Sequence, residues 1–174
     1  MIRLTGLVYR AHHPRWAFDP ASGQGAAVHG GRFNPKGMEA LYTARRLETA
    51  WLEAQQGFPF KAQPMTMCAY EVDCEDVVDL SDVSELDRLQ ITPSDLSSGW
   101  EDLAAHGKIP RTWALARRLV NEGAAGILVP SYAPGAVAKA DINAVFWRWS
   151  AAPPHQVRVI DDIGRLPTDD TSWR

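Results

Sequence analysis

The stretch from His29 to Glu53 carries three side chains whose types and spacing suit chemistry, namely Arg32, Tyr42 and Glu53. A guanidinium offers paired N–H donors to a phosphate or carboxylate, and an aromatic ring stacks on planar groups. A carboxylate stabilises positive charge that develops during a reaction. Together these residues offer a cation, a phenol and a carboxylate in a fixed order, which suits a binding or catalytic site.

A turn and a short strand are expected to position the first two of these residues. Segment 30–37 is rich in glycine, asparagine and proline on both sides of Arg32, which places that side chain at the edge of a shaped loop. Segment 40–44 is short, apolar and bounded by polar residues, as a buried strand is. Tyr42 therefore lies at or near the end of a strand.

The residues from Arg45 to Gln56 have helical periodicity and place Glu53 at the edge of the predicted buried face. Gly57 and Pro59 mark the end of this helix. The apolar residues of the face are Leu47, Ala50, Trp51 and Ala54. Glu48 lies at the opposite edge, so periodicity alone does not choose between the two carboxylates, and both also fit ordinary solvated charges.

A first strand is expected over Leu7–Ala11, with Arg10 at its exit. The following segment Pro14–Gly31 has no periodicity, and connections of this length in compact domains are usually functional or mobile, so we interpret it as a cover for a ligand site. His12 and His13 are adjacent, so in an extended strand they point to opposite faces. We interpret both as structural or surface residues.

The middle of the chain predicts two strands, over 64–72 and 77–80, and two helices. The first helix is short and acidic, is capped by Ser81 and runs to Leu89. An irregular segment from Thr92 to Gly99 follows. The second helix, Pro110–Asn121, has proline at its first position and is expected to pack on the sheet.

The run Gly126–Val129 is continuously apolar and predicts a central buried strand. Pro130 ends its hydrogen-bond ladder, so Ser131 emerges at the strand end as a donor. A serine in this position is also a common turn former. Further strands are expected over 143–150 and 156–160, and the tail from Gly164 is polar.

Strands and helices are interspersed, but too few helices connect consecutive strands for a doubly wound parallel sheet. We therefore expect one α+β domain over residues 1–174, with a mixed, split or partly barrelled sheet. The sequence contains neither the glycine-rich fingerprint of a dinucleotide-binding Rossmann fold nor that of a phosphate-binding P-loop.

Charge and composition argue against several classes of protein. The net charge of −3 and the short basic runs disfavour direct nucleic-acid binding. The N-terminus lacks the apolar region of a signal peptide, and no apolar run is long enough to span a bilayer, so a cytoplasmic protein without membrane contact is expected. Cys68 and Cys74 have no zinc-site spacing, so we expect two unpaired cysteines and no metal.

Several spaced motifs resemble the signature of the RES domain, a family known as the toxin half of RES–Xre toxin–antitoxin pairs. The shared elements are Val8–Arg10, Gly30–Pro35, Leu41–Ala44, Glu53 eleven residues after Tyr42, and Gly126–Ser131. The resemblance covers roughly residues 7 to 150 and implies an ADP-ribosyltransferase-like fold. Such folds bind NAD as a substrate in a cleft between small sheets, so no cofactor is expected.

The resemblance implies cleavage of the bond between nicotinamide and ribose in NAD. Glu53 would stabilise the oxocarbenium-like charge on the ribose. Arg10 and Arg32 would hold the diphosphate, Tyr42 would stack on nicotinamide or ribose, and Ser131 would add an orienting hydrogen bond. Ser97 and Ser98 are other candidates for the family serine. The acceptor of the ADP-ribosyl group, which includes water, phosphate, protein and nucleic acid, stays open, and an Xre-type antitoxin is the implied partner.

Two alternatives come from other classes of function. One is an RNA-cutting toxin that uses His12, His13 or His29 with the arginines, although the acidic charge balance disfavours it. The other is a non-catalytic binding module in which the arginine, tyrosine and glutamate form a buried network. Release of free nicotinamide from NAD is expected only of the NAD-consuming enzyme.

Overall fold

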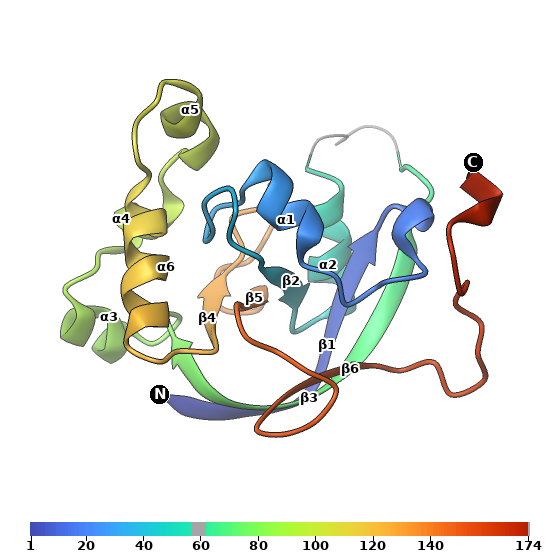
Figure 1. Ribbon diagram of the computed structural model, residues 1–174. Helices are drawn as coiled ribbons and strands as arrows, with labels where there is room; N and C mark the ends of the chain where they lie inside the picture. The colour runs from blue at the N-terminus through green and yellow to red at the C-terminus, as the bar shows by residue number, and fades with distance from the viewer. Residues whose placement is uncertain (57–61, 174) are drawn as a thin grey trace.

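The computed structural model describes residues 1–56 and 62–173 (Figure 1). The predicted helix end at Gly57 and Pro59 lies outside these residues. In chain order the elements are β1 (Ile2–His12), the 3-10 helix η1 (Pro14–Trp16), α1 (Gln24–His29), β2 (Leu41–Ala44), α2 (Leu47–Ala54), β3 (Thr66–Asp79), α3 (Val83–Leu89), α4 (Pro93–Ser97), α5 (Trp100–Ala105), α6 (Arg111–Asn121), β4 (Gly126–Pro130), β5 (Ile142–Phe146), β6 (His155–Val159) and the 3-10 helix η2 (Thr171–Trp173).

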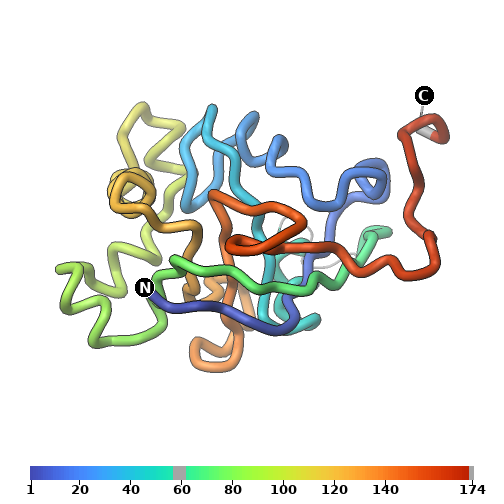
Figure 2. The backbone as a smooth tube through the Cα atoms, turned by 60° about the horizontal axis from the view of Figure 1, so that its bottom comes forward, coloured from blue at the N-terminus to red at the C-terminus, as the bar shows by residue number. Residues whose placement is uncertain are grey.

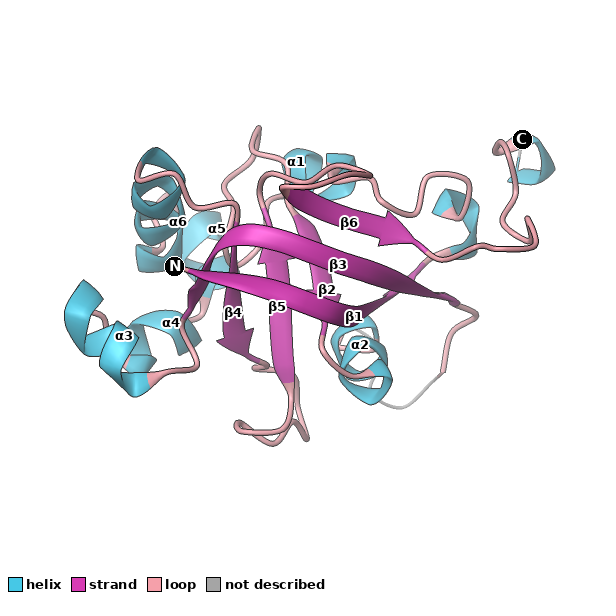
Figure 3. Ribbon diagram, turned by 90° about the horizontal axis from the view of Figure 1, so that it is seen from below, coloured by secondary structure: helices cyan, strands magenta, loops and turns pink. Residues whose placement is uncertain are grey.

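The strands form one sheet in the order β1-β2-β5-β4-β3-β6, and β1 also pairs with β3 (Figure 3). The first five of these strands therefore close into a ring. Among the paired strands described, β3 and β4 run parallel and the other pairs run antiparallel. The predicted α+β class with a mixed, partly barrelled sheet is confirmed.

The ring is held least firmly between β1 and β2. In the described part of the chain these strands share the single pair Tyr9↔Ala44, whereas β1 pairs with β3 from Ile2↔Val77 to His12↔Thr66. Helix α2 packs against β1 and β2 beside this weak seam. Because the last residues of β1 do not pair with β2, that side of the strand can line a pocket.

Strand β3 is continuous, so the prediction of two separate strands is wrong. The acidic run Asp73–Asp76 resembles a turn in sequence, but Arg3 pairs with Asp73 at 2.6 Å and keeps this run within the sheet. Asp76 has φ of +60°, and the register with β1 shifts nearby, as in a β-bulge. For the same reason β1 extends well beyond the predicted Leu7–Ala11, because its first half pairs with the second half of β3.

The connection from β3 to β4 contains α3 to α6, which lie together on one side of the molecule (Figures 1 and 2). The predicted irregular segment 92–99 is instead a helix, because Thr92 and Asp95 form a reciprocal capping box at the start of α4. Asp82, not Ser81, caps α3. Helix α6 is confirmed, with Pro110 as its N-cap rather than its first residue.

The core lies on both faces of the sheet because successive strand residues point to opposite sides. One cluster includes Leu41, Tyr70 and Phe146, and the other includes Ile127, Val145 and, from α6, Leu119. Confirmed strands over the predicted 40–44, 126–129 and 156–160 segments supply much of this core, whereas β5 ends at Phe146 and is shorter than predicted. No helix among the described residues is long and apolar enough to cross a membrane.

Candidate active site

The loop before β2 is a turn that is held by hydrogen bonds to the side chain of Tyr42 in β2. The Tyr42 hydroxyl donates to Asn34 Oδ1 at 2.7 Å and accepts from the Phe33 amide at 2.9 Å. Asn34 in turn donates to the carbonyls of Ala26 and Met38, both at 2.8 Å. A Cβ at Gly31 would lie 2.5 Å from the Tyr42 hydroxyl, so the turn needs glycine there. Burial raises the pKa of Tyr42, which keeps its proton for this structural hydrogen bond.

This turn places Arg32 next to the end of α4 and the residues that follow it. Nη1 of Arg32 donates to the carbonyls of Ser98 at 2.6 Å and Leu96 at 3.1 Å. The guanidinium carbon lies 4.9 Å from the centre of the Tyr132 ring, a cation–π distance. Burial lowers the pKa of Arg32, although an arginine remains charged in proteins. One nitrogen makes both carbonyl bonds, so Nε and Nη2 are not used in them.

Glu53 is held by three side-chain donors. Ser131 Oγ donates to Glu53 Oε1 at 2.6 Å, Asn143 Nδ2 donates to the same oxygen, and Gln56 Nε2 donates to Oε2. Glu48 is exposed over 67% of its side chain and lies 3.5 Å from Arg46. The structure therefore distinguishes the two carboxylates that periodicity left equivalent.

The helix that carries Glu53 is rotated relative to the prediction. Its buried residues are Thr49 and Ala50, whereas Leu47 and Trp51 are exposed by 48% and 37%. The predicted apolar stripe is thus only partly buried. The rotation arises because Thr49 donates to the buried carboxylate of Asp141, which draws the polar Thr49 inward. It also turns Glu53 toward the sheet.

Arg10 lies near the end of β1 and anchors the Pro14–Gly31 segment. Its Nη1 donates to the carbonyls of Pro20 and Ser22, both at 2.9 Å, and the Tyr70 hydroxyl also donates to Pro20. Burial lowers the pKa of Arg10. The segment has no periodicity in sequence, but it contains the short helices η1 and α1. Gly23 starts α1, and Gly30 ends it at φ of +77°.

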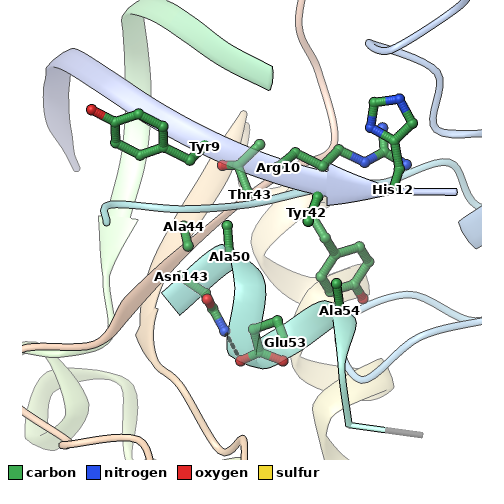
Figure 4. A pocket seen from close by; sticks show the side chains of 11 residues that line it. Tyr9, Arg10, His12, Tyr42, Thr43, Ala44, Ala50, Glu53, Ala54 and Asn143 are labelled. Atoms are coloured by element: carbon green, nitrogen blue, oxygen red, sulfur yellow. Dashed lines mark hydrogen bonds between the residues drawn. The ribbon is translucent and has the colours of Figure 1, made fainter. Parts of the chain in front are cut away.

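Two adjoining cavities bring the predicted residues together. A cavity of about 450 Å³ is lined by Arg10, Arg32, Tyr42 and Glu53. A second, of about 300 Å³, shares Arg10, Tyr42 and Glu53 and extends along β1 and α2 (Figure 4). Ser131 is not among the lining residues of either cavity, but it contacts Glu53, which lines both. Its hydroxyl positions the carboxylate, whereas Ser98 offers only its carbonyl to Arg32 and Ser97 Oγ bonds the Ser94 carbonyl.

Sequence reasoning missed Asn143, Gln56 and Tyr132, which line the larger cavity. Asn143 was included in a strand but not considered as a site residue. Its signal is an amide at the start of an otherwise apolar strand, where a polar side chain is costly unless it has a partner. Tyr132 directly follows Ser131 in the chain, and this adjacency to a candidate site residue is the signal that could have identified it.

Of the histidines considered above, His12 lines the 300 Å³ cavity together with Glu53. Nδ1 of His13 accepts a hydrogen bond from the Arg15 amide at the start of η1. His12 also lines a neighbouring pocket, and His29 lines that pocket with it. Cys68 and Cys74 are buried free thiols. Within residues 1–56 and 62–173, no group of three or more His, Cys, Asp and Glu side chains is placed to hold a metal ion.

This geometry can bind an anion between two arginines and place a fixed carboxylate beside it. The sequence matches the RES domain family over residues 7–169. The chain belongs to the RES domain family. Its fold is similar to a chain of the crystal structure of the MbcT–MbcA toxin–antitoxin complex of M. tuberculosis, with a TM-score of 0.62 and 19% sequence identity over 92% of this chain and 84% of that one. Comparison of this RES domain with curated proteins gave no significant match.

Proposed function

We propose that this RES domain protein is the toxin of a toxin–antitoxin pair and that it consumes NAD by cleaving the bond between nicotinamide and ribose. One observation carries the proposal: a carboxylate fixed by three side-chain donors lies in a cavity that two arginines also line. The membership of the RES family and the fold shared with a toxin–antitoxin complex support the toxin role.

Glu53 has the properties that the bond cleavage needs. Departure of neutral nicotinamide leaves positive charge on the ribose, so the transition state resembles an oxocarbenium ion. A carboxylate stabilises this charge best when it is already oriented, because it then needs no reorganisation during the reaction. Hydrogen bonds from Ser131, Asn143 and Gln56 provide this orientation.

The arginines have the properties that a diphosphate needs. Arg10 and Arg32 both line the 450 Å³ cavity with Glu53, and each uses one nitrogen, Nη1, to bond backbone carbonyls. Their side chains are therefore fixed in place before a ligand arrives. Arginine also suits phosphate better than lysine because its planar fork donates two parallel hydrogen bonds. Tyr42 contributes its ring face to the cavity wall, since its hydroxyl already holds the turn.

The ADP-ribosyl group passes to water, to phosphate, or to a protein or nucleic-acid acceptor, so the protein acts as an NAD glycohydrolase, a phosphorylase or an ADP-ribosyltransferase. We place this activity in the cytoplasm, under the control of an Xre-type antitoxin. The complex with the similar fold contains a toxin and an antitoxin, which supports an antitoxin partner for this chain.

Incubation of the purified protein with NAD, and separately with RNA, tests the proposal. We expect free nicotinamide to appear and the RNA to stay intact. Comparing the products with and without phosphate identifies the acceptor, since a phosphorylase yields a phosphorylated ADP-ribose. Cleaved RNA together with intact NAD would contradict the proposal, and no change in either substrate would favour a binding module.

A further inference from the structure

Asp141 is a buried carboxylate that connects the two parts of the chain that meet at Glu53. It is 4% exposed and is not among the lining residues of either cavity with Glu53. One part is α2, which carries Glu53, and the other is the β4–β5 region, which carries Ser131 and Asn143. Asn143 points toward Glu53 across the gap between them (Figure 4). The two parts must keep a fixed separation if Glu53 is to accept both hydrogen bonds.

The side chain of Asp141 holds the N-terminal end of α2. Its Oδ1 accepts a hydrogen bond from Thr49 Oγ1 at 2.5 Å and lies 3.4 Å from Nη1 of Arg46. Arg46 is the N-cap of α2 and provides no capping bond from its side chain, and negative charge is favourable at this end of a helix. Thr49 and Glu53 are four residues apart, so they lie on the same face of α2, one turn from each other. The contact that draws Thr49 inward therefore also sets the direction of Glu53.

The same residue closes the connection between β4 and β5. Oδ2 of Asp141 accepts a hydrogen bond from the Val137 amide at 2.7 Å, and its backbone carbonyl accepts one from the Ser131 amide, also at 2.7 Å. Asn143 follows two residues later in β5. Asp141 thus fixes the backbone beside both of the donors that this region offers to Glu53, while its carboxylate holds α2.

A carboxylate suits this position better than a neutral amide. The hydrogen bonds from the Thr49 hydroxyl and the Val137 amide lower the pKa of Asp141, so it is ionised near pH 7 and both of its oxygens accept. An asparagine has one accepting oxygen and would turn an NH2 group toward one of these donors. The shape of the side chain alone therefore does not meet the requirement.

We propose that Asp141 is a positioning residue for the Glu53 carboxylate, on which it acts through Thr49 and the β4–β5 connection. The inference rests on the proposed function, in which Glu53 stabilises the charge on the ribose. Loss of the anchor lets α2 shift relative to Ser131 and Asn143, and a misplacement of about 1 Å can cost about a hundredfold in rate.

Thr49→Val tests the anchor, because it is close in shape and removes only the hydroxyl that joins α2 to Asp141. We expect kcat for nicotinamide release to fall about tenfold to a hundredfold. KM for NAD should stay within about twofold, because Arg10 and Arg32 are held by contacts outside α2. Thr49→Ser keeps the hydroxyl and should recover most of the lost kcat.

Thr112→Val is the matched control. Thr112 is also a buried threonine of a helix, but among the described residues its Oγ1 has no hydrogen-bond partner. It is not among the lining residues of either cavity with Glu53. Thr112→Val should therefore keep the wild-type kcat and keep or raise the melting temperature.

Combination with Glu53→Gln separates positioning from a general loss of structure. If Thr49 acts through the carboxylate, Thr49→Val should lower kcat much less in the Glu53→Gln protein than in the wild type, because residues that act as a unit are not additive. A loss by the same factor in both backgrounds would show a general effect on the fold and would overturn the inference.

The side-chain amide of Asn143 provides a measurement that needs no NAD. It donates to Glu53, so its signal in a heteronuclear NMR spectrum reports the position of the carboxylate. Thr49→Val should move this signal toward that of an amide without a protein partner, and Thr112→Val should leave it in place.

The outcomes separate this inference from the proposed function. An Asn143 signal that depends on Thr49, in a protein that releases no nicotinamide, would support the anchor and contradict the NAD-consuming function. Cleavage of NAD with unchanged kcat in Thr49→Val would support the function and overturn the positioning role. An Asn143 signal that Thr49→Val does not move would overturn it whatever the activity.

Discussion

At the scale of single residues, the Glu53 carboxylate depends on groups that are distant in sequence. Ser131 follows β4, Asn143 lies in β5 and Gln56 follows α2, yet all three donate to this one side chain. A carboxylate on a lone surface helix would be free to rotate and would be strongly hydrated. Here its oxygens are already directed, which is the property that electrostatic catalysis uses.

Arg32→Lys tests whether the paired N–H donors of the guanidinium are needed to bind NAD. Lysine keeps the charge but cannot make paired hydrogen bonds or the same stacking contact with Tyr132. We expect KM for NAD to rise about tenfold in a nicotinamide-release assay, the effect of losing one charge-assisted bond. Arg45→Lys, at an exposed arginine after β2, is the control. An unchanged KM would show that Arg32 only braces the turn against α4.

His12 makes the stability of the fold depend on pH. Its pKa is lowered to about 4 by burial, against about 6.5 in an unfolded chain. Between these values the unfolded state binds the extra proton, so this residue makes stability rise as pH rises and fall as pH falls. From pH 7 to pH 5 the loss from His12 is about 2 kcal/mol.

Urea denaturation of the wild type and His12→Phe at pH 7 and pH 5 measures this loss. The variant cannot take up the proton, so its free energy of unfolding should fall by about 2 kcal/mol less than that of the wild type. Carboxylates with lowered pKa values, such as Asp141, contribute equally to both proteins and cancel in the comparison. Equal losses in the two proteins would contradict the burial of a neutral His12.

The residue types at the site were predictable, but their contacts were not. Arg10, Arg32, Tyr42 and Glu53 all line one cavity, as the motif spacing suggested. The choice of Glu53 over Glu48 from residues alone was not possible, because it depends on how α2 is rotated. That rotation follows from Thr49 and Asp141, which are 92 positions apart. Asn143 was missed because the chain gives no local sign of its distant partner.

At the scale of elements, the turn before β2 is the part that sequence reasoning described best. Its glycines and Asn34 are needed for close backbone packing. These requirements depend on residues close by in the sequence, so they can be recognised without the structure. Strands β2, β4 and β6 were also predicted, because each is a short apolar or alternating run between clear breaks. Strand β3 was divided in two since its acidic run pairs with Arg3, far away in the chain. Helices α4 and α5 were missed because each has fewer than two turns.

Gly31→Ala tests the turn. The new methyl group would lie 2.5 Å from the Tyr42 hydroxyl and 2.6 Å from Asn34 Oδ1, so the turn must shift. We expect a loss of about 1–3 kcal/mol in the free energy of unfolding, typical of overpacking, together with reduced nicotinamide release. Gly25→Ala, where an added Cβ meets no atom within 4 Å, should leave stability the same or higher. Similar stability in the two variants would contradict the described turn.

At the scale of the whole molecule, the site lies where the ring of strands is least closed. The last residues of β1 pair with β3 and not with β2, so the seam beside α2 opens into the cavities. A partner that inserts an anionic group or a chain terminus there could pair with Arg10 or Arg32. The Pro14–Gly31 segment is already fastened by Arg10, Tyr70 and Trp149, which favours plugging of the cavity over locking of this segment.

Plugging makes the antitoxin and NAD compete. Saturating NAD should then weaken antitoxin binding, and the antitoxin should weaken NAD binding by the same factor. The titration uses Glu53→Gln so that NAD is not consumed, after direct measurement shows that this variant binds NAD. Antitoxin affinity that does not change with NAD would falsify plugging and favour an inhibitor that acts elsewhere on the fold.

The central claim is that the Glu53 carboxylate stabilises the charge that forms when nicotinamide leaves. Nicotinamide release by Glu53→Gln and by Glu48→Gln, in parallel with the wild type, tests it most directly. Glutamine keeps the size and most hydrogen bonds of glutamate but removes the charge, so we expect Glu53→Gln to fold normally and to lose about a hundredfold or more in kcat. Glu48→Gln should match the wild type, since Glu48 is exposed. Undiminished release by Glu53→Gln, or a loss in Glu48→Gln instead, would contradict the account.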